Sequence, residues 1–165
     1  MSRVDARATG PAAGVEFEPD LFDDPSFLLA RANALSLAAG NAALVEHDLR
    51  VRSYSVLALA AGDRRPTQRE LAELLRLDPS QVVALVDDLQ SRRLVIRQPD
   101  PSDRRANVVL ATEEGRALYA LAASSVAAAQ DALLNGLSRP DRDQLTTLLR
   151  RLAFADHPHR ESRWG

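Results

Sequence analysis

The sequence predicts a mainly helical protein that carries one small β-hairpin. Apolar residues recur at helical spacing through most of the chain between residues 26 and 153. The stretch 94–110 departs from this period and is typical of two short strands around a polar turn. Two short helical patterns come directly before the hairpin, and a long one follows it. A helix, a turn, a second helix and then a two-stranded wing is the order of a winged helix-turn-helix lobe.

The composition is that of an ordinary globular protein. A chain of 165 residues suits one domain, and 45% hydrophobic with 27% charged residues is typical of soluble proteins. The absence of cysteine excludes disulfides and thiolate metal sites. A net charge of −2 at first argues against a nucleic-acid partner. However, all 21 basic residues are arginine, and several cluster between positions 92 and 105.

The sequence indicates neither a secretion signal nor a membrane anchor. Acidic residues interrupt the apolar positions from Phe17 to Leu29, unlike a signal peptide. No uninterrupted apolar run reaches the roughly 18 residues of a membrane span. We therefore expect a cytoplasmic protein without membrane contact.

The N-terminal third predicts an arm and two helices. Residues 1–24 hold glycine, proline and scattered acids without periodicity, which is typical of a flexible arm. Ser26 is the expected cap of a helix that runs to about residue 47. A second helix is expected over 51–61, closed by Gly62.

The middle of the chain predicts the helix-turn-helix. Thr67 and Glu70 form a capping-box pattern at the start of a short helix. Asp78 then caps a second helix, with Pro79 at its first position, and this helix is expected over 79–92.

The hairpin pairs an apolar run at 94–97 with a β-branched run at 107–110. Pro99 and Pro101 are expected to keep the charged tip out of regular pairing.

Two further helices are expected at the C-terminal end. Thr112 caps a long helix to about residue 134, and Ser138 starts another after Gly136. Their apolar stripes, and that of the first helix, exceed what one chain of this length can bury, which favours a dimer over a monomeric bundle. We expect dimerisation helices at 25–48 and 112–155, a DNA-binding lobe at 49–111 and a flexible tail at 156–165.

The residues around the hairpin also match a known pattern. They are Leu89, Leu94, Val95, Arg97, Asp103, Arg104, Arg105, Leu110, Thr112 and Gly115. They follow a Leu-Val-x-Arg strand, an Asp-x-Arg wing and a Leu-Thr-x-x-Gly helix start, the last being one residue looser here. This pattern resembles that of the MarR family of winged helix-turn-helix transcription regulators, over roughly residues 26–153.

The resemblance implies a DNA-binding wing at 98–106. Arg105 would enter a minor groove, where narrow A·T-rich segments concentrate negative potential. Arg104 would contact phosphate, and Asp103 would hold an arginine fork by a bidentate pair. The alternative is a solvated turn with an incidental salt bridge.

The helix at 79–92 is the expected major-groove reader, although it departs from the family pattern. Ser80 and Gln81 are suitable partners for base edges, and Val83 or Ala84 would touch a thymine methyl or merely pack. Asp87 and Asp88 would repel phosphate unless Arg69, Arg92 or Arg93 neutralises them. Arg93 also stands where the family usually has the glycine that ends this helix.

Candidate phosphate contacts lie at two helix starts, where free backbone N–H groups attract anions. They are Arg50, Arg52, Thr67, Gln68 and Arg69. Each arginine is equally consistent with a plain solvent-facing side chain.

The resemblance also implies a small aromatic or phenolic effector, bound near the first, second and long helices. The candidate polar groups are Arg31, Asn33, His47, Ser53 and Tyr54. Aromatic residues make up only 4% of the chain, so an aromatic-lined pocket would be small.

Catalysis, metals and cofactors are not expected. His157 and His159 lack further ligands for a metal site. The sequence shows no nucleophile with a base partner and no glycine-rich phosphate loop. The expected function is therefore a homodimeric, effector-released repressor on a pseudo-palindromic operator in double-stranded DNA. The alternative is a winged-helix protein–protein module, which Asp87 and Asp88 on an exposed face would favour.

Overall fold

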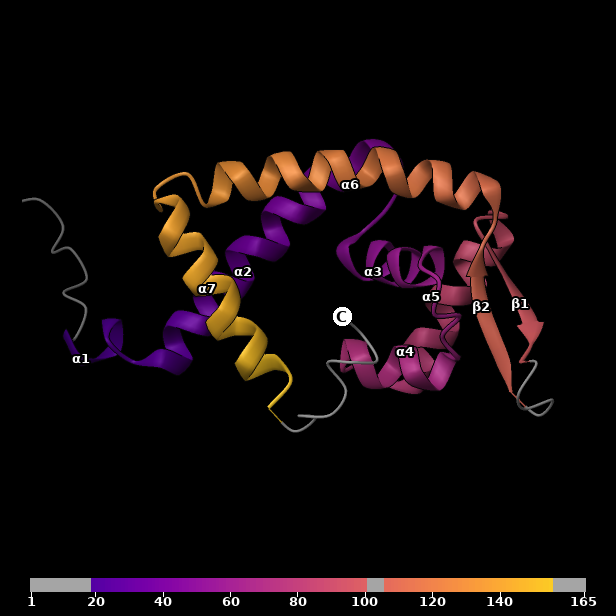
Figure 1. Ribbon diagram of the computed structural model, residues 1–165, viewed down its shortest axis with the longest axis horizontal. Helices are drawn as coiled ribbons and strands as arrows, with labels where there is room; N and C mark the ends of the chain where they lie inside the picture. The colour runs from indigo at the N-terminus through magenta and orange to yellow at the C-terminus, as the bar shows by residue number, and fades with distance from the viewer. Residues whose placement is uncertain (1–18, 101–105, 156–165) are drawn as a thin grey trace, which may run out of the picture. The chain divides into compact units, whose positions relative to one another are not determined.

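The computed structural model describes residues 19–100 and 106–155. Their elements are α1 (Pro19–Phe22), α2 (Pro25–Leu44), η1 (Val45–His47), α3 (Val51–Ala61), α4 (Gln68–Leu75), α5 (Pro79–Ser91), β1 (Val95–Pro99), β2 (Asn107–Ala111), α6 (Glu113–Leu133) and α7 (Arg139–Ala153) (Figure 1). The prediction of a mainly helical chain with one hairpin is confirmed. The chain divides into two compact units, 1–34 and 35–165, and α2 runs from one into the other.

The core lies in the second unit, where α3, α4, α5 and the hairpin pack together. Its largest fully buried side chains include Leu44, Val56, Leu57, Leu71, Val82, Val86, Leu89, Val95 and Val109. They occupy the apolar positions that the helical and strand periods place on one face of each element. Each such side chain contributes about 1.5–3 kcal/mol when fully buried. The apolar pattern therefore holds the helix-turn-helix and the hairpin as one lobe.

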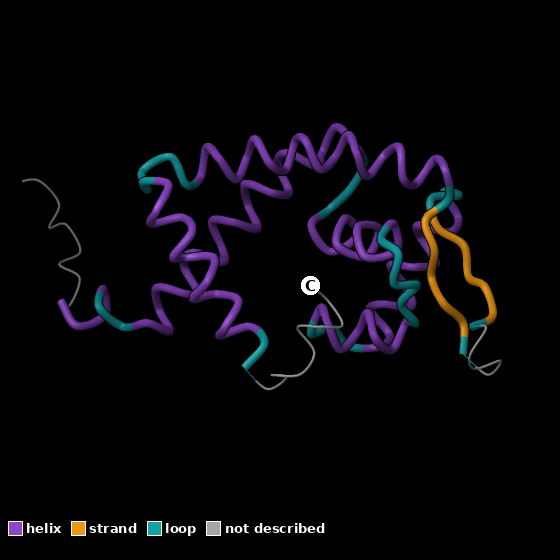
Figure 2. The backbone as a smooth tube through the Cα atoms, viewed as in Figure 1, coloured by secondary structure: helices purple, strands orange, loops and turns teal. Residues whose placement is uncertain are grey.

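The hairpin is an antiparallel pair that runs from Val95 opposite Ala111 to Pro99 opposite Asn107. Figure 2 shows the two strands side by side in orange. The expectation that Pro99 stays out of regular pairing was wrong. Proline lacks only the backbone N–H, and the last residue of an edge strand tolerates that loss. The predicted tip residues Pro101, Asp103, Arg104 and Arg105 lie outside the described residues.

The hairpin is also fastened to the start of α4. The Val109 backbone N–H donates to the Pro66 carbonyl at 2.8 Å, and Thr67 forms an isolated bridge with Val108. The hairpin therefore continues from the helix-turn-helix through backbone hydrogen bonds as well as through the core.

Most of the predicted helix caps are confirmed. Thr67, Asp78, Thr112 and Ser138 each accept a backbone N–H from the first turn of the helix that follows. The expected cap at Ser26 was wrong, because the Asp24 carboxylate accepts the Phe27 N–H at 2.7 Å and the helix begins at Pro25, two residues earlier than a cap at Ser26 implies. Within the predicted arm, α1 is helical; residues 1–18 and the predicted tail 156–165 lie outside the described residues.

The junction between α5 and β1 is tight. Arg93 has a φ of 60°, in the left-handed region where the family pattern usually has glycine. The N–H groups of Arg93 and Leu94 donate back to Gln90 and Leu89 at 2.9 Å each, which is a Schellman ending. Arg93 therefore adopts the backbone conformation of the glycine it replaces.

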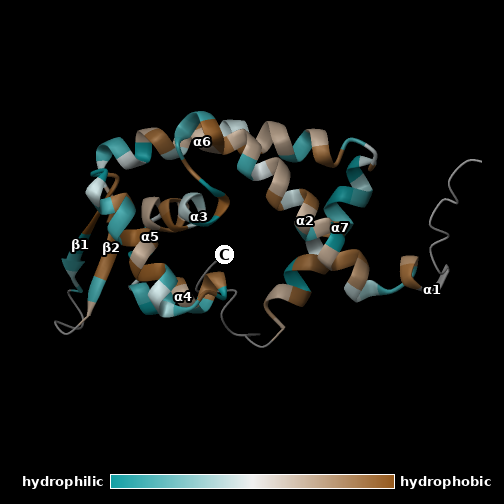
Figure 3. Ribbon diagram, turned by 180° about the vertical axis from the view of Figure 1, so that it is seen from behind, coloured by the Kyte–Doolittle hydropathy of each residue, from teal (hydrophilic) through white to brown (hydrophobic). Residues whose placement is uncertain are grey.

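Helices α2, α6 and α7 keep several apolar side chains exposed to solvent. Leu28 and Leu35 on α2, Leu121 on α6, and Leu148 and Leu152 on α7 are all exposed. The segment Pro25–His47 meets the length and hydropathy of a membrane span, with a mean hydropathy of 1.3, which corrects the expectation that no such segment exists. Only 6% of its most apolar window is buried. Figure 3 colours the ribbon by hydropathy, with apolar residues in brown on α2 and α6. These helices therefore carry apolar surface that the described chain leaves uncovered.

Candidate nucleic-acid interface

The exposed face of α5 carries the four predicted base-reading residues. Ser80, Gln81, Val83 and Ala84 are all exposed, because the apolar period turns the opposite face of the helix into the core. The helix thus presents its N-terminal half to solvent, as a reading helix in a major groove must.

Both polar side chains at this end of α5 also take part in its cap. The Ser80 hydroxyl donates to the Asp78 carboxylate at 2.5 Å, and Gln81 Oε1 accepts the Asp78 N–H at 3.3 Å. The hydrogen bond from the Ser80 hydroxyl lowers the pKa of Asp78, and the bond from the Ser80 backbone N–H lowers it further, by a smaller amount. Base contacts by Ser80 would compete with this cap.

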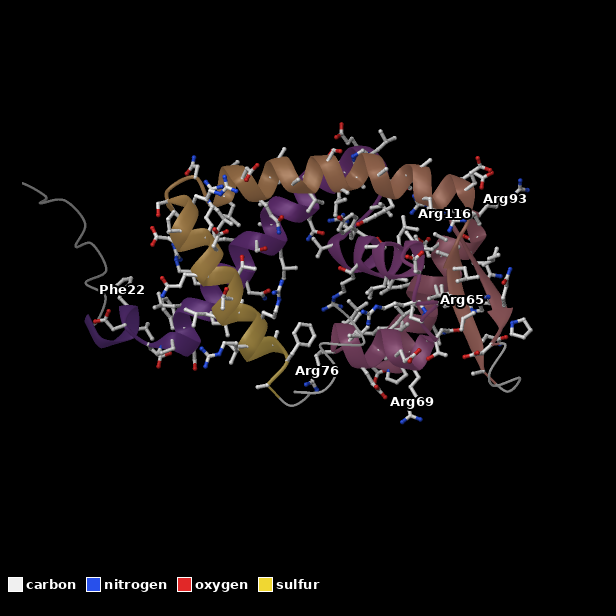
Figure 4. The ribbon with its side chains drawn as sticks, viewed as in Figure 1. Phe22, Arg65, Arg69, Arg76, Arg93 and Arg116 are labelled. Atoms are coloured by element: carbon white, nitrogen blue, oxygen red, sulfur yellow. The ribbon has the colours of Figure 1, made fainter. Side chains whose placement is uncertain are left out.

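The start of α4 presents the second group of predicted contacts. The Thr67 hydroxyl accepts the Glu70 N–H at 3.2 Å, and Glu70 accepts the Thr67 N–H at 2.9 Å, which completes the capping box. Arg69 extends into solvent (Figure 4), with its side chain 89% exposed, and forms an ion pair with Glu73 at 3.1 Å. An exposed pair of this kind is worth little, so Arg69 is available to a phosphate at small cost.

An open groove of about 900 Å³ separates α4 from the start of α5. It is lined by Gln68, Arg69, Ala72, Glu73, Arg76, Leu77, Pro79 and Val83. The structure thus brings the predicted contacts Gln68, Arg69 and Val83 to one surface.

A second cleft, of about 500 Å³, lies between the start of α3 and α5. Its lining residues are Asp48, Leu49, Arg50, Arg52, Ser53, Gln81, Ala84, Leu85, Asp88 and Arg92. Arg50 and Arg52 therefore lie on the same side of α5 as Gln81 and Ala84. This places two of the predicted phosphate contacts next to the reading helix.

The two acids on α5 are each matched by an arginine. Asp88 lies 3.6 Å from Arg92, one of the expected partners. Asp87 instead pairs with Arg97 on β1 at 2.5 Å, a partner that the sequence reasoning did not name. Arg92 also donates to the Asp48 carbonyl at 2.8 Å, which ties the end of α5 to the loop before α3.

An apolar pocket of about 180 Å³ lies between the end of α2, the start of α3 and α6. It is lined by Ser36, Ala39, Gly40, Leu44, Val51, Tyr54, Ser55, Val126, Ala129, Gln130 and Leu133. The Tyr54 ring lies 5.8 Å from that of Tyr119, centroid to centroid. Burial raises the pKa of Tyr54 most, and the neighbouring Tyr119 raises it further. Of the polar lining, sequence reasoning named Tyr54 and missed Ser36, Ser55 and Gln130, whose only signal is their spacing along apolar helix faces.

The other predicted effector residues do not line this pocket. Ser53 exchanges hydrogen bonds with the Arg50 backbone at the start of α3. His47 bonds Ser125 on α6, and Arg31 and Asn33 are exposed on α2. The structure therefore gathers only Tyr54 from that set into the pocket.

The pairing of His47 with Ser125 corrects the expectation that no nucleophile meets a base. His47 Nε2 lies 2.8 Å from Ser125 Oγ, and Glu46 approaches both groups, at 3.4 and 3.1 Å. A catalytic triad needs the carboxylate on the opposite ring nitrogen, Nδ1. Here Glu46 contacts the same Nε2 as the serine, so the arrangement is a hydrogen-bonded brace between η1 and α6. Within residues 19–100 and 106–155, no group of three metal-binding side chains gathers; His157 and His159 lie outside those ranges.

The exposed helix α5, the capped helix α4 before it and the hairpin after both define a winged helix-turn-helix protein. Residues 47–106 match the model of the MarR family. The crystal structure of a MarR-family transcriptional regulator from Rhodococcus sp. RHA1 superimposes on this chain with a TM-score of 0.79. The two sequences are 44% identical, and the match covers 84% of this chain and 98% of the regulator. The chain belongs to the MarR family of transcriptional regulators.

Three further relatives carry information about ligands and regulation. CouR from Rhodococcus jostii RHA1, solved with bound p-coumaroyl-CoA, is 46% identical over 83% of this chain and 96% of that one, with a TM-score of 0.76. A transcriptional repressor CouR, solved on a 23-mer DNA duplex, is 31% identical to this chain, with a TM-score of 0.76. The match covers 84% of this chain and 99% of that one. The transcriptional repressor NicR of Pseudomonas putida is 30% identical over 102 residues; the match spans 61% of this chain and 65% of NicR.

Proposed function

We propose that the protein is a homodimeric repressor that binds a pseudo-palindromic operator and releases it when an aromatic effector binds. The observation that carries this proposal is the exposed N-terminal half of α5, set beside the arginines of α3 and α4. A repressor 31% identical to this chain has been solved on a DNA duplex, which supports the same role here.

On DNA, α5 would lie in the major groove and the 98–106 wing in the adjacent minor groove. Gln81 is the residue best suited to a base edge, since glutamine bonds adenine bidentately. Arg50, Arg52 and Arg69 supply phosphate contacts from two helix starts. In the wing, Arg105 enters the minor groove, Arg104 contacts phosphate and Asp103 orients an arginine fork.

The dimer is proposed from the uncovered apolar surfaces of α2, α6 and α7. Leu121 and Leu152 are 63% and 60% exposed, which is costly for side chains of this size in a monomer. A second copy would cover these surfaces, and its two-fold axis would set two reading helices about one turn of DNA apart.

The pocket under Tyr54 is proposed as the effector site. A dry cavity of about 150 Å³ holds one benzene molecule, so about 180 Å³ suits a single phenolic ring. CouR, which is 46% identical to this chain, was solved with p-coumaroyl-CoA. We therefore propose an aromatic acyl group as effector, with its ring in the pocket and the remainder outside it.

The DNA-binding proposal is tested by selecting bound sequences from a random duplex pool and measuring affinity for the selected site. Binding should weaken as salt rises, because phosphate contacts release counterions. Arg105→Ala should weaken binding to every sequence, whereas Gln81→Ala should change which sequences are selected. If the wild-type dimer selects no common sequence, the repressor proposal fails.

The effector proposal is tested on the same complex with p-coumaroyl-CoA, p-coumarate and acetyl-CoA. Compounds with the aromatic ring should release DNA, and acetyl-CoA should not. Ala129→Leu fills the pocket and should abolish release while DNA binding persists. Ala127→Leu, exposed on the same helix and about a third of a turn from the face of Leu121, is the matched control and should respond like the wild type. Release of the Ala129→Leu complex would place the effector elsewhere.

The alternative of a protein–protein module was based on Asp87 and Asp88 on an exposed face. Both side chains are exposed, at 60% and 59%, and each is paired with an arginine, so neither presents an uncompensated charge to a partner.

A further inference from the structure

Arg97 joins the hairpin to both helices of the helix-turn-helix. From β1, its Nε donates to Gln68 Oε1 at 2.8 Å, at the start of α4. Its Nη1 donates to Gln90 Oε1 at 2.6 Å, and its Nη2 to Asp87 Oδ1 at 2.5 Å, both on α5. All three guanidinium nitrogens are engaged, and the side chain is only 23% exposed. Arginine is suited to this position, because a rigid planar fork reaches three acceptors at once.

The acid in this cluster lies on the reading surface. Asp87 follows Ser80 and Ala84 by seven and three residues, so the three side chains project from one side of α5. Its side chain is 60% exposed although it is paired. An unpaired carboxylate at this place would repel DNA phosphates, and the guanidinium of Arg97 cancels its charge from behind.

The cluster also links the hairpin to α5. Backbone bonds fasten the hairpin to the start of α4, through Val109 and Pro66. The side-chain hydrogen bonds that fasten the hairpin to the outer side of α5, among the described residues, run from Arg97 to Asp87 and Gln90. Arg97 therefore adds a side-chain link between α5 and the hairpin to the core that they share and to the tight turn at Arg93.

We propose that Arg97 is a positioning residue for DNA recognition, which acts by neutralising Asp87 on the reading surface. This inference rests on the proposed DNA-binding function. Arg97 acts through Asp87, and its role does not require a contact between its own side chain and DNA.

The test measures affinity for the selected operator by fluorescence anisotropy for Arg97→Gln, Asp87→Asn and the double variant. Arg97→Gln leaves a bare carboxylate on each protomer and should weaken binding by about tenfold or more. The double variant removes both charges and should regain most of the lost affinity. Asp87→Asn alone should bind at least as tightly as the wild type, because it removes an acid and leaves a cation at the interface.

A purely structural role gives a different pattern. The double variant would then remain as weak as Arg97→Gln, because the hydrogen bonds of the fork are still lost, and that result overturns the proposal. So does unchanged binding by Arg97→Gln. If Arg97→Gln does not fold, Asp87→Asn decides: a tenfold loss of affinity overturns the neutralising role, and retained affinity supports it.

The matched control is an ion pair outside the reading surface. Arg142 on α7 lies 3.1 Å from Asp131 on α6, with a similarly shielded guanidinium at 29% exposure. Arg142→Gln, Asp131→Asn and their double variant should leave operator affinity unchanged. Absence of operator binding by the wild type overturns the proposed function itself, which distinguishes that failure from failure of the Arg97 inference.

Discussion

A Cβ atom added to Gly115 would lie 1.9 Å from the carbonyl oxygen of Leu94. That carbonyl also accepts the Thr112 N–H at 3.0 Å, so the start of α6 lies directly on the start of the hairpin. Because the opposing atom belongs to the backbone, no side-chain rotation relieves the clash. This contact fixes where the long helix leaves the DNA-binding lobe.

We predict that Gly115→Ala lowers the free energy of unfolding by about 1–3 kcal/mol or more, since overpacking forces the backbone to shift. The measurement is urea unfolding followed by circular dichroism, at one fixed protein concentration. Gly136→Ala is the control, because a Cβ there meets nothing within 4 Å. Equal stability of the two variants would show that α6 and β1 separate readily.

Thr67→Ala should lower the free energy of unfolding by about 1 kcal/mol, the usual cost of losing an N-cap side chain. The hydroxyl is lost as acceptor for the Glu70 N–H, and Glu70 keeps only the Thr67 N–H as its partner in the box. Thr67→Ser retains the acceptor and should remain close to the wild type in the same unfolding measurement. A stable alanine variant would mean that packing alone holds the start of α4.

Ser125→Ala should also be destabilising, by about 1–3 kcal/mol, because it leaves a half-buried polar group without its bond. This polar group is the imidazole of His47, whose Nε2 lies 2.8 Å from the Ser125 hydroxyl. The His47 side chain is 13% exposed. Ser124→Ala is a neighbouring control, since the Ser124 hydroxyl is exposed and bonds within its own helix, at 3.2 Å from the Ala120 carbonyl. Thermal melts that do not separate the two variants would contradict the bracing role of Ser125.

Tyr54 should make stability depend on alkaline pH. Burial and Tyr119 raise its pKa in the folded protein above the ordinary value of 10.0, so the unfolded chain ionises first. The contribution of the neutral phenol is fully present below pH 10.0 and is lost as pH rises through the folded-state pKa. Tyr54→Phe should therefore lose less stability than the wild type between about pH 9 and pH 11. Guanidinium unfolding across this range measures the difference, and parallel curves would contradict it.

Local features of the sequence predicted local features of the structure. The caps at Thr67, Asp78, Thr112 and Ser138 were predicted because each cap depends on residues within a single helical turn. The cap at Ser26 was missed because Asp24, Pro25 and Ser26 all suit a helix start, and only geometry chooses among them. Arg93 was identified as an unusual residue at a glycine position, and its positive φ follows from the turn it occupies.

The candidate site was harder to predict from the sequence. The exposed face of α5 followed from its apolar period, so Ser80, Gln81, Val83 and Ala84 were predicted together. The partner of Asp87 was missed, because several arginines lie within reach along the chain and Arg97 contacts it only once the hairpin folds back. The pocket residues Ser36 and Gln130 were missed for the same reason, since nothing in either helix indicates which face meets the other.

The amino-acid sequence by itself determined the order of the main elements, most of their caps, their buried faces and the family. Those properties depend on periodicity and on hydrogen bonds between residues a few positions apart. Only the tertiary structure decided that Arg97 reaches Asp87, that Ser125 meets His47 across 78 residues, and that Leu94 leaves no room for a side chain at position 115. Such contacts depend on how whole helices and strands pack, because the free energy that selects them comes from the buried core they share.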